Sequence, residues 1–304
     1  FERELPVDIE KLKVEIRAEL RNELMGGKIG KEELNIEEQR RPIKKIIGRT
    51  KEIIKDFVKE RINTGIEDLD KLIDGGVPRG SNIIVAGGPG SGKTTLCLQI
   101  LAYHAARGKK CLYMSFDEPE SRLIQYMGDF GWNPEQLKKS GNLKIQMFNP
   151  FDITRSIDTF LMKAKGELLI EVDPIILPPN YTPDFIVVDS LTAISSAFPE
   201  NGDSRRLYIE QLFRLFSKMG ATSFLITEVD HIPTAFSEAG AEEFLADGII
   251  ALYNIKKGDA RQKLIEIIKL KGVHHSENIV PFEIGKSGIK LHFKNKKKDG
   301  KNNQ

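Results

Sequence analysis

Residues 87–94 read Gly-Gly-Pro-Gly-Ser-Gly-Lys-Thr, and this segment constrains the fold more than any other part of the chain. It has the spacing G-x-x-x-x-G-K-[ST], whose glycines let backbone N–H groups curl around an anion without Cβ clashes. The apolar run Asn82–Ala86 precedes it, and the helical stretch Thr95–Ala106 follows it. This order places the loop at a helix N-terminus, where the helix dipole favours phosphate. The segment therefore predicts a nucleotide-binding P-loop within an α/β fold.

Single positions in this loop carry the predicted chemistry. Lys93 is expected to reach the β- and γ-phosphates of ATP, and the hydroxyl of Thr94 to ligate Mg²⁺. The chain contains no N-K-x-D guanine motif, which favours ATP over GTP. We therefore expect ATP and Mg²⁺ as cofactors. The residues predicted to contact the nucleotide through the loop are Gly88, Pro89, Gly90, Ser91, Gly92, Lys93, Thr94 and Thr95.

An acidic partner for the loop stands at the end of a later strand. Residues 185–189 read Phe-Ile-Val-Val-Asp, a wholly apolar run that ends in a carboxylate. P-loop enzymes use such an aspartate to hold the magnesium shell, although an apolar strand can also end in aspartate as a simple cap. Beside the glycine-rich loop, the pattern predicts that Asp189 and Thr94 hold the metal.

A second acidic pair follows another predicted strand. Asp117 and Glu118 come directly after the run Lys110–Phe116, where a carboxylate can orient or deprotonate an attacking water. The alternative is that the two acids cap the helix that starts near Pro119, because acids favour helix N-termini. We expect Glu118 to act as the base and Asp117 to support it.

From residue 63 onward, short β-branched runs alternate with helical stretches, and a short turn at 256–260 joins the last two runs. The pattern predicts a mostly parallel sheet with helices on both faces and late antiparallel strands. Strands are predicted at Asn82–Ala86, Lys110–Phe116, Leu143–Phe148, Phe185–Asp189, Ser223–Val229, Gly248–Ile255 and Lys263–Lys271. Helices are predicted near 93–107, 119–130, 153–170 and 204–219.

The sequence divides into three regions. Residues 1–61 are dense in charge and carry apolar residues at helical spacing, which predicts an N-terminal helical extension. Its apolar stripes need a partner surface: the core, a neighbouring subunit, or a nucleic-acid or protein partner met through the basic cluster at 40–55. Residues 62–293 form the predicted ATPase domain, in which 168–184 is a proline-containing surface excursion. Residues 294–304 are a lysine-rich tail that is predicted to be disordered.

Composition argues against several classes of protein. Lysine plus arginine (46) nearly balances aspartate plus glutamate (44), which does not support nucleic-acid binding through bulk charge. The two cysteines are too few for a disulfide framework or a cysteine zinc site. No apolar stretch approaches the roughly 18 residues that a membrane span needs. We expect a cytoplasmic protein with no membrane partner.

Further motifs, in order along the chain, resemble the RecA-like ATPases of the KaiC and RadA group. Thr64–Asp70 and Gly75–Gly80 stand just before the P-loop strand, and the acidic pair in Phe116–Glu118 looks like that of KaiC domains. The other similar segments are Asp189–Thr192, Met219–Thr222, Glu242–Gly248 and Lys269–His275. The similarity covers about residues 63–292. It implies a RecA-like P-loop core and ATPase activity.

The resemblance also implies a homo-oligomeric ring, with a hexamer favoured, in which ATP lies between subunits. A Lys-x-Arg pair of the neighbouring chain then touches the γ-phosphate, and the matching residues here are Lys269 and Lys271. Lysine keeps the charge of arginine but loses its planar fork, which puts the hydrolysis rate in question. The alternative is that both lysines only decorate an edge strand. His275 lies in a family motif and is expected to make at most a minor nucleotide contact.

The functional prediction that follows is a slow, Mg²⁺-dependent ATPase with a regulatory or signalling role. KaiC's second domain phosphorylates itself on adjacent Ser and Thr, whereas residues 241–244 read Ala-Glu-Glu-Phe, so self-phosphorylation is not expected. One alternative is a RadA-like DNA-binding recombination accessory with loops at Ser195–Arg206 and Asp230–Glu243, although these loops hold mostly acids. Another is a nucleotide-gated adaptor that recruits a protein partner through residues 1–61.

Overall fold

The computed structural model describes residues 60–149, 177–196, 198, 202–230, 236 and 241–293. These residues belong to one unit, which begins at Glu60. The predicted N-terminal helices, the predicted helix at 153–170 and the tail at 294–304 lie outside the described residues, as does most of the 168–184 excursion. Within the described ranges, no helix is both long and apolar enough to cross a bilayer.

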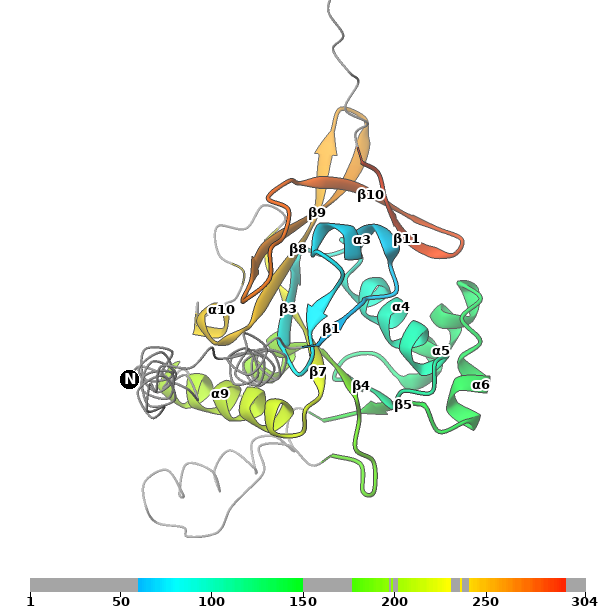
Figure 1. Ribbon diagram of the computed structural model, residues 1–304, viewed down its shortest axis with the longest axis vertical. Helices are drawn as coiled ribbons and strands as arrows, with labels where there is room; N and C mark the ends of the chain where they lie inside the picture. The colour runs from blue at the N-terminus through cyan, green and yellow to red at the C-terminus, as the bar shows by residue number, and fades with distance from the viewer. Residues whose placement is uncertain are drawn as a thin grey trace, which may run out of the picture. The chain divides into compact units, whose positions relative to one another are not determined.

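A nine-stranded sheet organises the described residues, in the order β11-β10-β9-β8-β3-β7-β6-β4-β5 (Figure 1). Its parallel strands are β3 (Asn82–Gly87), β4 (Cys111–Ser115), β5 (Leu143–Met147), β6 (Phe185–Asp189), β7 (Thr222–Glu228) and β8 (Gly248–Lys257). The antiparallel strands β9 (Ala260–Leu270), β10 (Val280–Gly285) and β11 (Gly288–Leu291) extend one side. A small separate pair joins β1 (Arg61–Ile62) to β2 (Val77–Pro78). The predicted mostly parallel sheet with late antiparallel strands is confirmed.

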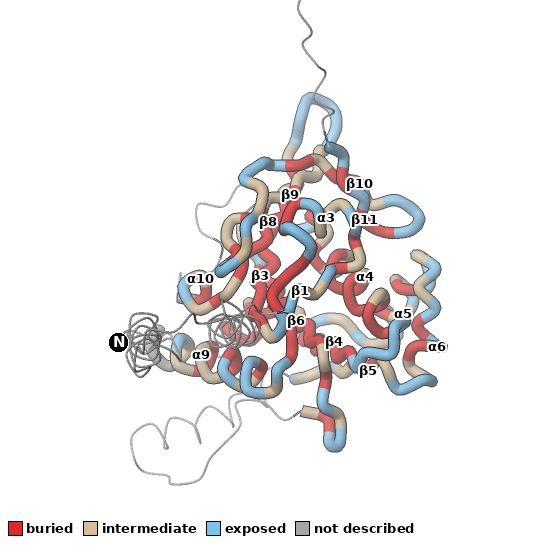
Figure 2. Tube along the Cα trace, in the orientation of Figure 1, coloured by how far each residue is buried: buried red, intermediate tan, exposed pale blue. Residues whose placement is uncertain are grey.

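Helices cover both faces of this sheet because its central strands are apolar on both sides. Along β3, Ile83 and Val85 join one buried cluster, whereas Ile84 and Ala86 join the other. The described helices on the first face are α3 (Glu67–Leu72), α4 (Lys93–Ala105), α5 (Glu120–Asp129) and α6 (Pro134–Lys139). Those on the second face are α8 (Leu191–Ser196), α9 (Gly202–Lys218) and α10 (Ala241–Leu245). The central strands are accordingly buried along their length (Figure 2).

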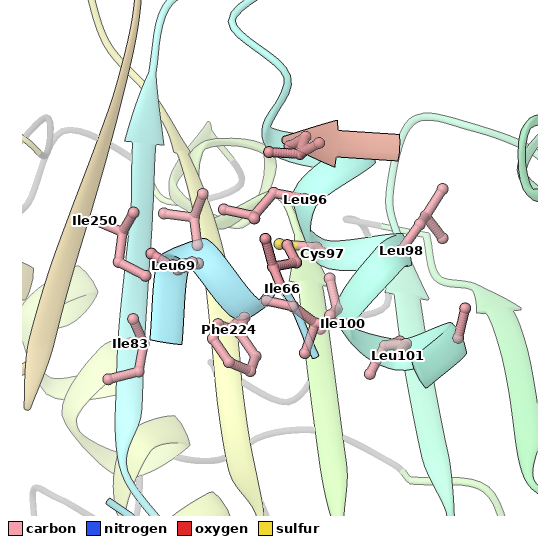
Figure 3. Packing of buried hydrophobic residues seen from close by; sticks show 14 of the residues in the cluster. Ile66, Leu69, Ile83, Leu96, Cys97, Leu98, Ile100, Leu101, Phe224 and Ile250 are labelled. Atoms are coloured by element: carbon pink, nitrogen blue, oxygen red, sulfur yellow. The ribbon is translucent and has the colours of Figure 1, made fainter. Parts of the chain in front are cut away.

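The packing between α3, α4 and the sheet fixes where the glycine-rich loop sits. Ile66 and Leu69, at the start of and within α3, and Leu96 and Ile100 of α4 point toward the sheet, where Phe224 fills the centre (Figure 3). Each of these side chains is almost completely buried. Burying such a residue stabilises the fold by about 1.5–3 kcal/mol, so α4 is held firmly behind the loop that it follows.

Several short elements were not predicted from the sequence. The hairpin β10–β11 was missed because Pro281 and the turn at 286–287 interrupt its strand pattern. The two predicted loops that could meet DNA are also corrected in part: Arg205 and Arg206 lie within α9, and Glu243 lies within α10. Helix α9 begins at Gly202, two residues before the start of the helix that was predicted near 204–219.

Candidate nucleotide site

The carboxyl ends of the parallel strands meet at one edge of the sheet. In the register, Gly87 of β3 pairs with Glu228 of β7, and Ser115 of β4 pairs with Asp189 of β6. Each of these residues lies at the end of its strand, so the loops that follow the strands leave from a common edge. Ligands of open parallel sheets bind at this edge.

The glycine-rich loop forms a cradle with no room for side chains. Gly90 and Gly92 have φ angles of +70° and +106°, which glycine adopts without cost. A Cβ on Gly92 would lie 3.0 Å from Cδ1 of Ile284 in β10, and one on Gly90 would lie 3.3 Å from Nδ2 of Asn254 in β8. Backbone rather than side chains therefore lines the loop, as the binding of a phosphate group requires.

Lys93 is the first residue of α4, and its ammonium lies inside the cradle. Its Nζ donates to the carbonyl oxygens of Gly87 and Gly88, at 2.7 and 3.2 Å. The side chain is buried, and burial lowers the pKa of Lys93, while nearby Glu228 and Asp189 oppose this shift. A buried cation whose partners are mainly carbonyl oxygens is suited to exchange them for an anion.

Thr94 and Asp189, the two residues that were predicted to hold the metal, are in direct contact. The Thr94 hydroxyl donates to Oδ2 of Asp189 at 3.0 Å, and the buried Tyr113 hydroxyl donates to the same oxygen. Burial raises the pKa of Asp189, whereas these two hydrogen bonds lower it. A hydroxyl, a carboxylate and substrate phosphates make an oxygen site of the kind that Mg²⁺ prefers. No cluster of three or more His, Cys, Asp or Glu side chains suited to a metal occurs in the described ranges.

Asp117 and Glu118 follow β4 at the same edge, and neither caps the next helix, because Pro119 is the N-cap of α5. The Ser115 hydroxyl donates to the carbonyl oxygen of Glu118 at 2.6 Å, and the Glu118 amide approaches the same hydroxyl at 3.1 Å, which fixes the backbone. Oε2 of Glu118 is buried and has no hydrogen-bond partner among the described residues. Asp117 is exposed; partial desolvation and the nearby Glu228 raise its pKa.

Sequence reasoning missed two members of this group. Glu228 ends β7, pairs with Gly87 at the start of the loop, and interacts electrostatically with both Lys93 and Asp117. Tyr113 lies within the apolar strand β4, where its hydroxyl reaches Asp189. Glu228 could have been found by the signal that indicated Asp189, because both are acids that end an apolar strand. Tyr113 gave no signal because an aromatic residue in a strand normally packs in the core.

The strands beside β3 add a further group that the sequence did not indicate. Lys263 of β9 donates to the carbonyl oxygen of Gly90, and burial lowers the pKa of this lysine. Lys263 pairs with Asn254 of β8, whose buried Oδ1 has no partner among the described residues. Residues of β8 and β9 therefore contact the glycine-rich loop of their own chain at Gly90.

Lys269 and Lys271 lie at the opposite edge of the sheet from the loop. Lys269 pairs with Ile249, and the next residue, Leu270, pairs with Gly248, which in turn pairs with Ile83 at the start of β3. Strands rise about 3.3 Å per residue, so this level is roughly 13 Å from Gly87 along the strand alone. The structure does not bring these two lysines together with the loop of their own chain.

The side chains of both lysines point to helix α10. Nζ of Lys269 donates to the carbonyl oxygen of Glu243 at 2.8 Å, and Nζ of Lys271 approaches that of Phe244 at 3.5 Å. His275 lies in the segment after β9, where Nδ1 is 3.3 Å from the carbonyl oxygen of Val273. His275 is likewise not brought to the loop of its own chain.

The comparisons with known proteins agree with one another. The KaiC ATPase family model matches residues 62–296. The circadian clock oscillator protein KaiC of Rippkaea orientalis is 30% identical over 240 residues, which cover 76% of this chain and 44% of that protein. The circadian clock protein KaiC3 of Synechocystis is 32% identical over 234 residues, with 76% and 45% covered. The chain thus spans less than half the length of these curated relatives.

One solved structure matches this chain over nearly the whole of its own length, unlike the curated relatives. A KaiC-like protein of the hyperthermophilic archaeon Pyrococcus horikoshii aligns with a TM-score of 0.62 and 30% identity, covering 77% of this chain and 99% of that one. The sheet order, the glycine-rich loop and the family match converge on one assignment. This chain belongs to the KaiC ATPase family.

Proposed function

We propose that this chain is a slow, Mg²⁺-dependent ATPase that acts as a ring, with ATP held between subunits, and that it has a regulatory role. The residues proposed to hold the phosphates are Gly88, Pro89, Gly90, Ser91, Gly92, Lys93, Thr94 and Thr95. Thr94 and Asp189 would hold Mg²⁺, which neutralises phosphate charge when bound. Glu118 accepts the proton of the attacking water, and Asp117 supports it.

The observation that carries the ATPase proposal is the meeting of these groups at one edge. The Lys93 ammonium, the Thr94–Asp189 hydrogen bond and the unpartnered Oε2 of Glu118 come from three different strand ends. A buried carboxylate oxygen with no described partner is costly, and a water held for attack would satisfy it. The arrangement supports hydrolysis rather than nucleotide binding alone.

The placement of the lysine pair supports the proposed ring. Lys269 and Lys271 stand at the positions of the family's Lys-x-Arg pair, with lysine in place of the arginine, yet they lie at the far edge of their own sheet. In a ring, one subunit can present this edge to the loop edge of the next, so a lysine can serve its neighbour's phosphate. His275, close behind in sequence, would then make a minor contact there. The regulatory role rests on the names of the curated relatives, which are clock proteins.

Turnover and light scattering test the proposal. We expect ATP with Mg²⁺ to promote ring assembly and slow phosphate release. Lys271→Ala should slow turnover, since losing one charge-assisted contact to developing phosphate charge costs on the order of 2–4 kcal/mol of barrier. ATP binding to the variant subunit should stay nearly unchanged, because the lysine serves another chain.

Mixed rings separate a trans role from a cis role. A Lys271→Ala subunit keeps its own Glu118, and a Glu118→Gln subunit keeps its own Lys271. If the two residues come from different chains, some sites in a mixed ring contain both, and two inactive proteins recover activity together. Mixed rings that form and stay inactive would remove the trans assignment. Phosphate release without ring assembly would remove the ring itself.

A further inference from the structure

The two lysines that are proposed to act on a neighbour are held by unequal contacts. Lys269 is anchored by a 2.8 Å hydrogen bond to the Glu243 carbonyl, whereas Lys271 has only a 3.5 Å contact with the Phe244 carbonyl. Lys271 has one further described partner, the carboxylate of Asp247, whose Oδ1 lies 3.6 Å from its Nζ. Asp247 therefore supplies a carboxylate beside the Lys271 ammonium.

Asp247 is fixed more rigidly than the lysine that it faces. Its amide donates to the carbonyl oxygen of Asn82 at 2.9 Å, and its Oδ2 accepts the Asn82 amide at 3.1 Å. Its own carbonyl oxygen accepts the Lys271 amide at 2.8 Å. Asp247 is thus tied to β3 on one side and to the end of β9 on the other, with Oδ1 left to face the ammonium.

We propose that Asp247 is the positioning residue that presents Lys271 to the nucleotide of a neighbouring subunit. The inference rests on the proposed function, because it assigns a partner to the lysine that acts across the ring. Asp247 touches no nucleotide in this assignment. It acts by narrowing the range of positions that a flexible side chain occupies.

The need for such a residue follows from the charges present. Lysine carries its charge on a flexible four-carbon stem and, unlike arginine, has no planar fork to orient it. Lys269 stands two residues away on the same strand face and repels Lys271, and this repulsion contributes to a lowered pKa for Lys269. The carboxylates of Asp247 and Glu243 offset part of this repulsion at Lys269. Because Lys271 stays 42% exposed, it remains free to meet a further anion.

The placement of one substitution within mixed rings tests the inference. Co-expression yields rings of Lys271→Ala acceptor chains and Glu118→Gln donor chains, with composition read by native mass spectrometry. Active sites then combine an acceptor Glu118 with a donor Lys271. Asp247→Asn keeps an oxygen for the Asn82 amide but removes the charge. Exposed ion pairs are weak, so in the donor it should lower turnover about two- to five-fold.

The same substitution in the acceptor should leave turnover unchanged, because the acceptor has no Lys271 to position. An equal loss from either chain would show that Asp247 serves only the fold and would overturn the inference. An unchanged rate with the substitution in the donor would also overturn it, while the proposed function would stand. Mixed rings that remain inactive with Asp247 intact would reject the trans lysine, and the inference with it.

Asp68→Asn in the donor is a matched control. Asp68 pairs with Lys71 at 3.1 Å, and its side chain is 24% exposed, close to the 22% of Asp247. It lies in α3, on the other face of the sheet from α10. Mixed rings with the control substitution should have the same turnover as mixed rings without it. Thermal unfolding should show that both the Asp68→Asn and the Asp247→Asn variants are folded. A control that lowers turnover as much as Asp247→Asn would make the effect a general one and would overturn the assignment.

Discussion

His104 offers a test of the fold that does not involve the nucleotide. It lies in α4, is only 5% exposed, and stacks on Phe185 with ring centroids 3.7 Å apart. Its Nε2 lies 3.0 Å from the carbonyl oxygen of Asn63, so the neutral ring donates this hydrogen bond. Burial, with smaller contributions from Arg107 and Lys109, lowers the pKa of His104 from 6.5 to about 4.

The direction of the pH dependence follows from this pKa. Between pH 4 and 6.5 the unfolded chain binds a proton at this residue and the folded chain does not. The free energy of unfolding should therefore rise with pH across this window and reach its full value above pH 6.5. Acidification from neutral pH should lower it by the same amount. One pH unit of separation is worth 1.36 kcal/mol, so His104 accounts for at most about 3 kcal/mol. We expect about 2 kcal/mol, because a pocket lined by Asn63 and His104 opens beside the ring and gives solvent access that reduces the desolvation.

Urea unfolding from pH 4.5 to 7.5, followed by circular dichroism, measures this contribution. His104→Gln keeps a donor for the Asn63 carbonyl but does not titrate, so the variant should lose this part of the pH slope. The exposed His292 offers a matched substitution, His292→Gln, that leaves the buried ring in place. If His104→Gln and the wild type have parallel pH profiles, the buried neutral histidine is refuted.

Three further predictions concern the site and the core. Lys93→Ala should abolish nucleotide-dependent activity while circular dichroism stays unchanged, and wild-type ATP affinity in this variant would refute the site. Glu118→Gln should bind ATP but suppress phosphate release, because the amide cannot accept the proton of water; a slower Asp117→Asn would show that the two acids were assigned the wrong way round. Phe224→Ala should lower the free energy of unfolding by roughly 3–5 kcal/mol, measured by urea titration, since its ring fills the buried centre between α3, α4 and the sheet.

The local patterns were strong enough to predict the P-loop and the central strands. Asn82–Gly87 and Phe185–Asp189 are short apolar runs between clear breakers, and the glycines at 87–92 leave few alternatives to a strand–loop–helix unit. Parallel strands also end at a common edge, so the sequence alone indicated that the predicted Asp189 and Thr94 could meet. The 3.0 Å contact between them agrees with that reasoning.

The contacts made by side chains from distant parts of the chain could not be read from the sequence. Tyr113 resembled any core aromatic residue, and Lys263 resembled any lysine on a strand, until the register placed them beside Asp189 and Gly90. Resemblance singled out Lys269 and Lys271, and the turn at 256–260 predicted an antiparallel strand, but only the register of β9 with β8 showed at which level of the sheet the two lysines lie. Register is a property of the whole sheet, because it depends on which partner each strand finds. The local order of residues therefore determined the P-loop, whereas the tertiary structure decided that both lysines lie away from the loop of their own chain.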